Sequence, residues 1–454
     1  MENKNVKLMR GNPETAVRKL AIPIMISMIL TASYNIIDGI WIAGLGEVAI
    51  AAVGFVTPIF MILNGVSVGL GNGATSSISR FIGAQDKENV NESAMHSLLI
   101  FLVASILLTI FLLLIQEPVL KLYGAKGAAL TQAIQYGTPL FGGLIAFIFA
   151  NGASGILRGE GDMKRAMYAV VVSVILNAIF DPIFIYTLNL KVAGAAYATI
   201  LSSLISAVVI LYWIVIKKDT YAEIDFKKFR FKTKMTKDIL KVGIPASLDM
   251  VMMSIAVAFY LAFIAQINGD YGIAVYTSGQ RLYLFVLMPL TAIGSAVTTV
   301  VGSAYGAKNG DYISRAHKYG SKLGILFGLV TTILLVLFAD PLSTMFAYTP
   351  ETAYLIPGIV LFLRVATLSL PLTGAGMASS FFYQGIGKGF LSLFFTILRE
   401  IIFAVSLTYY FGIVLDMGLL GIWIGLALGR SIASAINYFA GRYTIKKIRE
   451  DIGT

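Results

Sequence analysis

Four polar residues inside long apolar stretches have side chains of the kinds that bind a small cation or carry a proton. They are Asp38, Asn177, Asp181 and Thr199. Asn177 precedes Asp181 by four residues, so on a helix both side chains point in the same direction. A charged group in the middle of a bilayer costs about 2.5 kcal/mol or more, so acids found there usually serve a function. The two aspartates are therefore the first candidates for a functional site.

These residues reach a similar depth if each apolar stretch crosses a bilayer as a helix. Asp38 then lies about one turn, and Asp181 about two turns, from the outer end of its helix. In the next helix Thr199 lies about two turns and Ala195 about one turn from the outer end. The adjacent Gly194 is expected to free the Ala195 carbonyl. The expected group holds two carboxylates, an amide, a hydroxyl and a backbone carbonyl.

This oxygen-rich group has three interpretations. In the first, the two carboxylates share a proton that moves between them. In the second, oxygens of Asp38, Asn177, Asp181 and Thr199 ligate a hard monovalent cation such as Na⁺, because hard cations prefer oxygen ligands. In the third, the polar side chains only hold helices together, through contacts worth about 0.6–2 kcal/mol each. Two acids at matching depth favour a proton or cation site.

Two prolines lie where the helices that carry these acids can bend. Pro23 is near the start of the first apolar stretch, and Pro182 directly follows Asp181. Because proline lacks an N–H, each removes a helical hydrogen bond and permits a bend. We expect both prolines to act as hinges that let proton or cation binding change the shape of a helix.

The composition indicates that the solvent of these stretches is a bilayer. Of 454 residues, 57% are hydrophobic and only 13% are charged, whereas about a quarter of a soluble domain is charged. The absence of cysteine excludes disulfides and thiolate metal sites. With only two histidines, no bound cofactor is expected. The net charge of +11 suits lipid headgroups, and no nucleic-acid partner is expected.

Runs long enough to cross the membrane occur twelve times, since a crossing helix needs about 20 mostly apolar residues. They are too long and too evenly apolar for the strands of a barrel. The predicted fold class is an all-α polytopic membrane protein, with twelve transmembrane helices in two six-helix, pseudo-symmetric lobes around a central cleft. The expected spans are 17–42, 48–79, 97–116, 130–152, 166–188, 192–216, 239–266, 272–303, 319–339, 353–382, 390–412 and 417–440.

The basic residues predict the orientation of these spans. With the N-terminus inside, 27 of the 35 Lys and Arg residues fall in inner segments and three fall in outer loops. Short loops rich in Lys and Arg stay on the cytoplasmic side. Both termini are therefore expected in the cytoplasm, and the expected location is the cytoplasmic (inner) membrane of a prokaryote.

The two halves of the chain resemble each other. GLGNGATSSISRFIGAQDKE at 69–88 aligns with AIGSAVTTVVGSAYGAKNGD at 292–311, and Pro23 aligns with Pro245 at nearly the same offset. Such a repeat of six spans predicts two lobes in the same orientation that rock against each other and transport a solute. The alternative is an ancient gene duplication without rocking. We expect this protein to act as a monomer, with an N-lobe at 1–216, a cytoplasmic linker at 217–238 and a C-lobe at 239–454.

Sulfur and aromatic side chains in the second half suggest a site for organic cations. Met250, Met253, Tyr276 and Tyr283 are candidates to line an adaptable cleft, because rings and thioethers bind flat cations. The alternative is that these side chains contact lipid or the protein core.

The second half also carries charges that need partners. Asp249 lies one turn past Pro245, and Arg281 is expected to reach it as a structural or gating ion pair. Arg399 and Glu400 are consecutive, so on an α-helix they do not face each other. Each of these two is expected to have a partner elsewhere.

Several motifs together resemble one transporter family. The twelve spans in two lobes, Pro23 and Asp38 in the first span, LRGEGDMKRAM at 157–167 and LNAIFDP at 176–182 are similar to the multidrug and toxic compound extrusion (MATE) transporters. The resemblance covers nearly the whole chain. The spacing of the polar residues is similar to that of the prokaryotic DinF-like and archaeal-type branch.

This resemblance implies antiport of drugs against H⁺ or Na⁺, coupled in the first lobe. Asp38 matches the acid of the first helix, Asn177 and Asp181 match the pair of the fifth helix, and Ala195 and Thr199 match ligands of the sixth. For Na⁺, the implied ligands are Asp38, Asn177, Asp181 and Thr199.

One region departs from the sodium-driven branch of that family, which carries a glutamate about two turns after the proline of span seven. Met252, Met253 and Ser254 occupy that region here. Coupling is therefore expected to rest on the first lobe.

The sequence thus predicts a secondary active antiporter rather than an enzyme. It is expected to export amphiphilic or cationic organic compounds by alternating access, in exchange for H⁺ or Na⁺ bound at Asp38 and Asp181. The runner-up is a lipid-linked oligosaccharide flippase of the same wider superfamily, which needs a basic cleft. A polytopic intramembrane enzyme is a different class, and only the aspartate pair offers it reactive groups at one depth.

Overall fold

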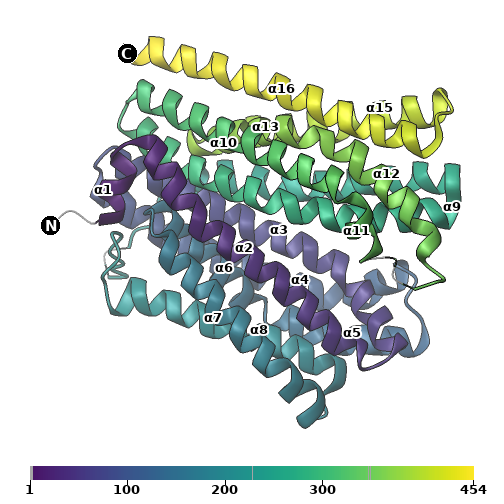
Figure 1. The fold of residues 1–454 in the computed structure, drawn as a ribbon. Coiled ribbons are helices and arrows are strands. Elements are labelled where there is room, and N and C mark those ends of the chain that lie inside the picture. The colour runs from purple at the N-terminus through teal and green to yellow at the C-terminus, as the bar shows by residue number, and fades with distance from the viewer. Residues whose placement is uncertain (1–3, 228, 346, 348, 454) are drawn as a thin grey trace. The chain divides into compact units, whose positions relative to one another are not determined.

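The computed structural model describes residues 4–227, 229–345, 347 and 349–453, and most of these residues are helical (Figure 1). Helices satisfy their own backbone hydrogen bonds, as a bilayer requires. Within these described residues, ten helices are long and apolar enough to cross a membrane. The bent pair α5 (Gly127–Gly142) and α6 (Leu144–Gly159) makes eleven when it is counted as one span.

The longest helix, α9 (Thr233–Gly306), contains a break that brings the number of spans to twelve. At Gly269, φ is 51° and ψ is −139°, which no helix contains. Glycine allows this conformation because it has no Cβ. The two parts of α9 correspond to the spans expected at 239–266 and 272–303. The all-α fold with twelve spans is therefore confirmed.

The chain divides into two compact units, and two long helices contribute to both. Unit 1 is Met1–Met9 and Ile26–Ser247, and unit 2 is Arg10–Met25 and Leu248–Thr454. Helix α2 (Pro13–Ala43) changes unit after Met25, two residues beyond Pro23, and α9 changes unit after Ser247, two residues beyond Pro245. Each of the aligned prolines thus lies beside the point where its helix leaves one unit for the other.

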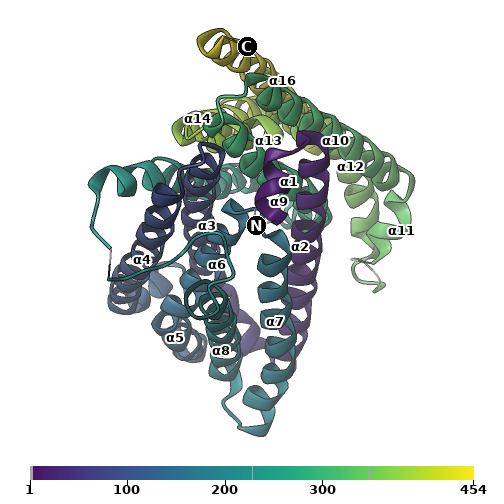
Figure 2. The ribbon, with the colours of Figure 1, turned by 90° about the vertical axis from the view of Figure 1, so that its left-hand side faces the viewer.

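Unit 1 is organised around two long helices that approach closely. A Cβ on Gly155 of α6 would lie 2.3 Å from the backbone oxygen of Gly71 on α3, so these positions need glycine. Helix α3 packs against α4, α5 and α6, and α7 packs against α8 (Figure 2). Besides α5, α6 and parts of α2 and α9, the unit contains α1 (Lys4–Arg10), α3 (Glu47–Gly83), α4 (Lys87–Leu122), α7 (Met163–Pro182), η1 (Ile183–Thr187), α8 (Lys191–Leu211) and η2 (Tyr212–Ile216).

Unit 2 has an aromatic core. Tyr260, Tyr276, Tyr283, Phe362 and Trp423 are all at most 2% exposed. Helix α10 packs against α13, which packs against α16 (Figure 1). Besides parts of α2 and α9, its elements are α10 (Gly310–Leu337), α11 (Ala339–Thr344), η3 (Ala353–Leu355), α12 (Ile356–Ala366), η4 (Thr367–Ser369), α13 (Leu370–Gly385), α14 (Gly389–Ile397), η5 (Leu398–Val405), α15 (Ser406–Tyr409), η6 (Tyr410–Val414) and α16 (Gly418–Ile452).

The internal repeat recurs in the local backbone of both units. Gln85 and Lys308 adopt the left-handed conformation, with φ of 61° and 51°. The residues that follow them, Asp86 and Asn309, cap the N-termini of α4 and α10. Each side chain accepts a hydrogen bond from the backbone N–H of the residue three positions later. The π-helices η1 and η6 also occupy matching places. A short turn separates η1 from α8, and a short turn separates η6 from α16. The aligned sequences therefore fold alike locally.

The polar segment that precedes α9 is held against unit 1 at the GEGD turn. The Glu160 carboxylate accepts hydrogen bonds from the backbone N–H groups of Tyr221 and Ala222, each at 2.8 Å. Arg165 forms an ion pair with Asp219 at 2.8 Å. Burial raises the pKa of Glu160 to about 7, although the hydrogen bonds from Ala222 and Tyr221 act in the opposite direction. This segment is thus anchored rather than loose.

Candidate functional site

The polar residues predicted in the first half lie near the ends of three helices in unit 1. These are the C-terminal ends of α2 and α7 and the N-terminal end of α8. Asp38 is in the last two turns of α2, Asp181 is the penultimate residue of α7, and Thr199 is in the third turn of α8. After Pro182 the chain continues as the π-helix η1 and returns through α8. A Cβ on Gly194 would lie 2.7 Å from the Phe184 carbonyl oxygen, so glycine lets α8 pack directly against η1.

The two carboxyl groups are in contact. Asp38 and Asp181 lie within hydrogen-bond reach of each other. A hydrogen bond between two carboxyl groups requires a proton on one of them, because ionised carboxylates only accept. Within the described residues, Oδ1 of Asp38 and Oδ1 of Asp181 are buried and have no hydrogen-bond donor. The pair can therefore share a proton, and its two free oxygens can ligate a cation.

Asn177 and Thr199 hold Asp181 from the other side. In the amide orientation that satisfies both ends, Nδ2 of Asn177 donates to Oδ2 of Asp181 at 2.9 Å. Oδ1 of Asn177 then accepts from the Thr199 backbone N–H at 3.2 Å. Oη of Tyr34 lies 3.2 Å from Oγ1 of Thr199. This chain of contacts ties α2, α7 and α8 together around the aspartates.

A second contact closes the end of the site. Oη of Tyr186, in η1, donates to the Trp41 carbonyl at 2.7 Å, and the two rings meet edge to face with centroids 6.0 Å apart. Trp41 lies in the last turn of α2, where carbonyls have no partner within the helix. A Cβ on Gly44 would lie 2.2 Å from this hydroxyl, so glycine leaves room for the contact. The contact fixes the end of α2, and with it Asp38, beside η1.

The structure thus brings together Asp38, Asn177, Asp181 and Thr199, with Ala195 buried one turn before Thr199. Reasoning from the sequence missed three tyrosines: Tyr34, Tyr186, and Tyr136, which is buried and within electrostatic reach of both aspartates. Tyr34 lies four residues before Asp38 on one helix, the spacing that singled out Asn177, and was open to the same argument. Nothing in the sequence marks Tyr136 or Tyr186.

The donor set of this pair bears on which ion it could hold. Within the described residues, no three or more His, Cys, Asp or Glu side chains gather closely enough to hold a metal ion. Two carboxylates with an amide and a hydroxyl suit a monovalent cation or a proton, because divalent cations such as Ca²⁺ use six to eight oxygens.

The expected substrate cleft in the second half needs a correction. Tyr276 and Tyr283 are 2% and 0% exposed and belong to the core of unit 2, where Tyr276 stacks on Trp423. Their rings fill the protein interior and are not open to a solute. Met250 is 41% exposed and Met253 is partly exposed, so only the methionines remain candidates for a cleft.

The buried charges of unit 2 differ from the expectation only in part, since Glu400 has the expected distant partner, Arg430, at 3.0 Å. Nε of Arg399 donates to Glu400 at 2.9 Å, although the two are consecutive. They lie in the π-helix η5, which has more residues in each turn than an α-helix and so brings neighbouring side chains closer in direction. Asp249 hydrogen-bonds to Thr396 and lies near Arg399 rather than pairing with Arg281.

Comparison with protein families gives a match to the MatE family over residues 23–183 and 245–410. The two matched segments begin at Pro23 and Pro245, the prolines that the internal repeat aligns. This agreement supports a chain built of two copies of one unit.

Comparison with individual proteins points to membrane transporters. The chain is 24% identical over 442 residues to the "Probable multidrug resistance protein YoeA" of Bacillus subtilis, covering 94% of this chain and 93% of that one. It is 25% identical over 346 residues to the "FAD transporter" of Shewanella oneidensis, covering 73% and 74%. A solved structure of a multidrug resistance MATE family transporter of the MOP superfamily, in an outward-facing conformation, is 39% identical, with a TM-score of 0.96 over 99% of this chain and 100% of that one.

Proposed function

Because the chain belongs to the MatE family of drug-exporting membrane transporters, which are not enzymes, we propose that it is an antiporter. It exports amphiphilic or cationic organic compounds in exchange for H⁺ or Na⁺ bound at Asp38 and Asp181. The observation that carries this proposal is the contact between the two carboxyl groups, each with a buried oxygen that has no hydrogen-bond partner. Two acids placed in such contact are costly unless a proton or cation joins them.

The proton and the sodium ion make different demands on the same atoms. A proton occupies the bond between Asp38 and Asp181. Sodium needs both carboxylates ionised, with Thr199 and Asn177 supplying further oxygens, so it displaces the shared proton. In the proton-bound case Asn177 donates to Asp181 at 2.9 Å and orients that carboxylate, whereas its oxygen can join a sodium ion only after the amide turns over. The two ions therefore compete for one site.

Coupling requires that ion binding change the affinity for the drug, and linkage makes this effect reciprocal. We place the coupling in helix shape, with Pro23 and Pro182 as hinges, during alternating access of an N-lobe at 1–216 and a C-lobe at 239–454 joined by the linker 217–238. Support comes from the change of unit in α2 just beyond Pro23. Met250 and Met253 remain candidates for contact with the drug.

The experiment that tests the proposal uses purified protein in liposomes with proton and sodium gradients imposed separately. Efflux of a fluorescent organic cation is expected to follow at least one gradient. Asp38→Asn and Asp181→Asn should each abolish it, while Asp270→Asn, at an exposed aspartate, should not. Full efflux in both site variants would overturn the coupling role.

The substrate range needs a second arm of the same assay. One relative is named as an FAD transporter, so FAD, an anionic dinucleotide, is tested beside the cation. Gradient-driven movement of the cation alone supports the proposal as stated, and movement of FAD alone overturns its substrate class.

The proposal also places the protein in a prokaryotic inner membrane as a monomer. The basic residues of the inner segments are the reason for placing both termini in the cytoplasm.

A further inference from the structure

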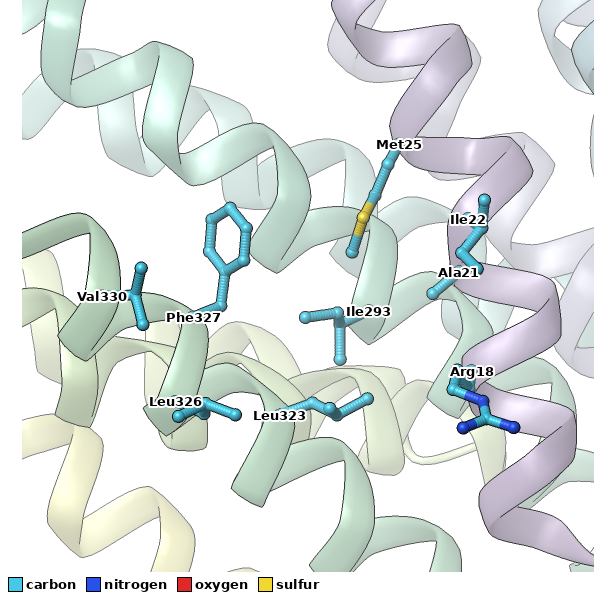
Figure 3. A pocket seen from close by; sticks show the side chains of 9 residues that line it. All are labelled: Arg18, Ala21, Ile22, Met25, Ile293, Leu323, Leu326, Phe327 and Val330. Atoms are coloured by element: carbon cyan, nitrogen blue, oxygen red, sulfur yellow. The ribbon is translucent and has the colours of Figure 1, made fainter. Parts of the chain in front are cut away.

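A surface groove in unit 2 runs between α2 and α10. Its volume is about 310 Å³, at the lower end of the range of about 300–1,000 Å³ typical of small-molecule sites. Figure 3 shows α2 and α10 contributing the two walls, with Ile293 of α9 between them. The lining residues are Arg18, Ala21, Ile22, Met25, Ile293, Leu323, Leu326, Phe327 and Val330.

The groove has one charged end and an apolar remainder. Arg18 is the one charged residue of this lining, and it is exposed. One turn earlier on α2, Glu14 is already paired with Arg315 of α10 at 3.3 Å, so the nearby acid is occupied. Lys322, directly before the lining residue Leu323, is exposed as well. Arg18 therefore puts a positive charge at one end of the apolar groove, and the exposed Lys322 adjoins the lining in the sequence.

The helices that form the groove are membrane spans, so its apolar part faces hydrocarbon. Both α2 and α10 are long and apolar enough to cross the bilayer. From Leu323 to Val330 the groove follows α10 for about 10 Å, at about 1.5 Å per residue. Arg18 lies near the start of α2, where a long basic side chain reaches the headgroup layer.

We propose that this groove binds one anionic phospholipid. Its phosphate lies on Arg18, and one of its chains follows the apolar wall past Phe327 to Val330. The charge of Arg18 disfavours an amphiphilic cation in the same place, and a free anion would leave the apolar part unfilled. A phospholipid satisfies both ends, since its charge and its hydrocarbon chain are joined as the groove requires.

The bound lipid also contacts the part of α2 that belongs to unit 2. Ala21, Ile22 and Met25 precede the point at which α2 passes into unit 1, and Pro23 lies among them. A chain in the groove therefore packs against both α10 and the segment that contains this proline. The lipid acts as a structural ligand there, whichever solute the protein exports.

The test is native mass spectrometry of the purified full-length protein in a neutral detergent. The protein is titrated with phosphatidylglycerol or with phosphatidylcholine that carries the same chains. We expect one saturable site that prefers phosphatidylglycerol. Arg18→Gln should weaken phosphatidylglycerol binding about fivefold, the factor that one basic residue contributes near an anionic lipid surface. Binding of phosphatidylcholine should change little.

Two further variants separate the charge from the groove. Val330→Trp, at an exposed lining position that tolerates a larger side chain, should fill the apolar end and weaken both lipids. Lys388→Gln removes an exposed cation outside the groove and should leave both affinities unchanged. Three results would each overturn the proposal. They are equal affinity of the wild type for the two lipids, an Arg18→Gln variant that binds phosphatidylglycerol as tightly as the wild type, and competitive displacement of phosphatidylglycerol by an organic cation.

Discussion

Nη2 of Arg430 lies 3.0 Å from Oε2 of Glu400 inside the core of unit 2. Arg399 holds the other carboxylate oxygen at 2.9 Å, so one acid serves two arginines. The Arg430 guanidinium also lies over the ring of Tyr283, 5.0 Å from its centroid. Glu400 and Arg430 are 3% and 4% exposed, so solvent cannot replace a lost partner.

The first prediction concerns this buried network. Glu400→Gln removes the acid that pairs with the buried Arg430 and one of the two acids near Arg399, the other being Asp249, and breaking a buried pair costs about 3–5 kcal/mol. The thermal unfolding temperature in detergent should fall clearly. Asp340→Asn is the matched control, since its pair with Arg364 at 2.9 Å is exposed and such pairs are worth about 0–1 kcal/mol. Equal unfolding temperatures for the two variants would show that the network does not stabilise unit 2.

The second prediction concerns the hydroxyl of Tyr34. Tyr34→Phe removes its 3.2 Å hydrogen bond to Thr199 and leaves the ring in place. A hydrogen bond contributes about 1 kcal/mol, so the ion concentration that gives half-maximal efflux should rise about fivefold. Efflux from liposomes at graded ion concentrations measures this shift. Tyr168→Phe changes an exposed tyrosine of α7 and should cause none. The same shift in both variants would remove Tyr34 from the site.

The third prediction concerns the contact that fixes the end of α2. Tyr186→Phe removes the hydroxyl that donates to Trp41, and Gly44→Ala places a methyl group 2.2 Å from that hydroxyl. Both variants should slow gradient-driven efflux severalfold without reducing the amount of folded protein, because Asp38 loses its fixed position. Tyr197→Phe alters an exposed tyrosine of α8 and serves as the control. Wild-type rates in both contact variants would argue that this contact does not position Asp38.

The residues of the site could be predicted in part from the sequence. Asp38, Asn177, Asp181 and Thr199 stand out because each is polar in a span and because helical spacing and depth are regular. Regularity of this kind also gives the twelve spans. It does not predict which tyrosine contacts a site, since the chain has 22 of them and apolar or half-apolar rings are common in spans.

The predictions that were wrong have two causes. One is local backbone that departs from the α-helix, and the other is contact between segments that are distant in the sequence. On an α-helix the side chains of Arg399 and Glu400 would point in different directions, whereas in the π-helix η5 they are in contact. Asp249 contacts Thr396, which is far away in the sequence. Tyr276 and Tyr283 are residues of the kind that line a cleft for organic cations, but they fill the core of unit 2. The core residues Phe362 and Trp423 come from other helices, which the sequence does not show.

The last prediction concerns pH and Glu160. Burial raises its pKa from 4.5 to about 7 in the folded protein, with Asp162 also raising it and Lys87 opposing. Between these values the unfolded chain releases a proton that the folded protein keeps, so the contribution of Glu160 to the free energy of unfolding is largest below pH 4.5 and falls as pH rises. The loss is roughly 3–4 kcal/mol, at about 1.4 kcal/mol per pKa unit.

Glu160→Gln should remove this dependence, because the amide has no proton to release in that range. The measurement is the difference in unfolding temperature between wild type and variant, followed from below pH 4.5 to above 7, which cancels the other titrating groups. The wild type should lose stability relative to the variant as pH rises. Glu47→Gln changes an exposed glutamate and should give a flat difference. A flat difference for Glu160→Gln as well, or a slope of the opposite sign, would mean that the hydrogen bonds from Tyr221 and Ala222 to the ionised carboxylate outweigh its burial.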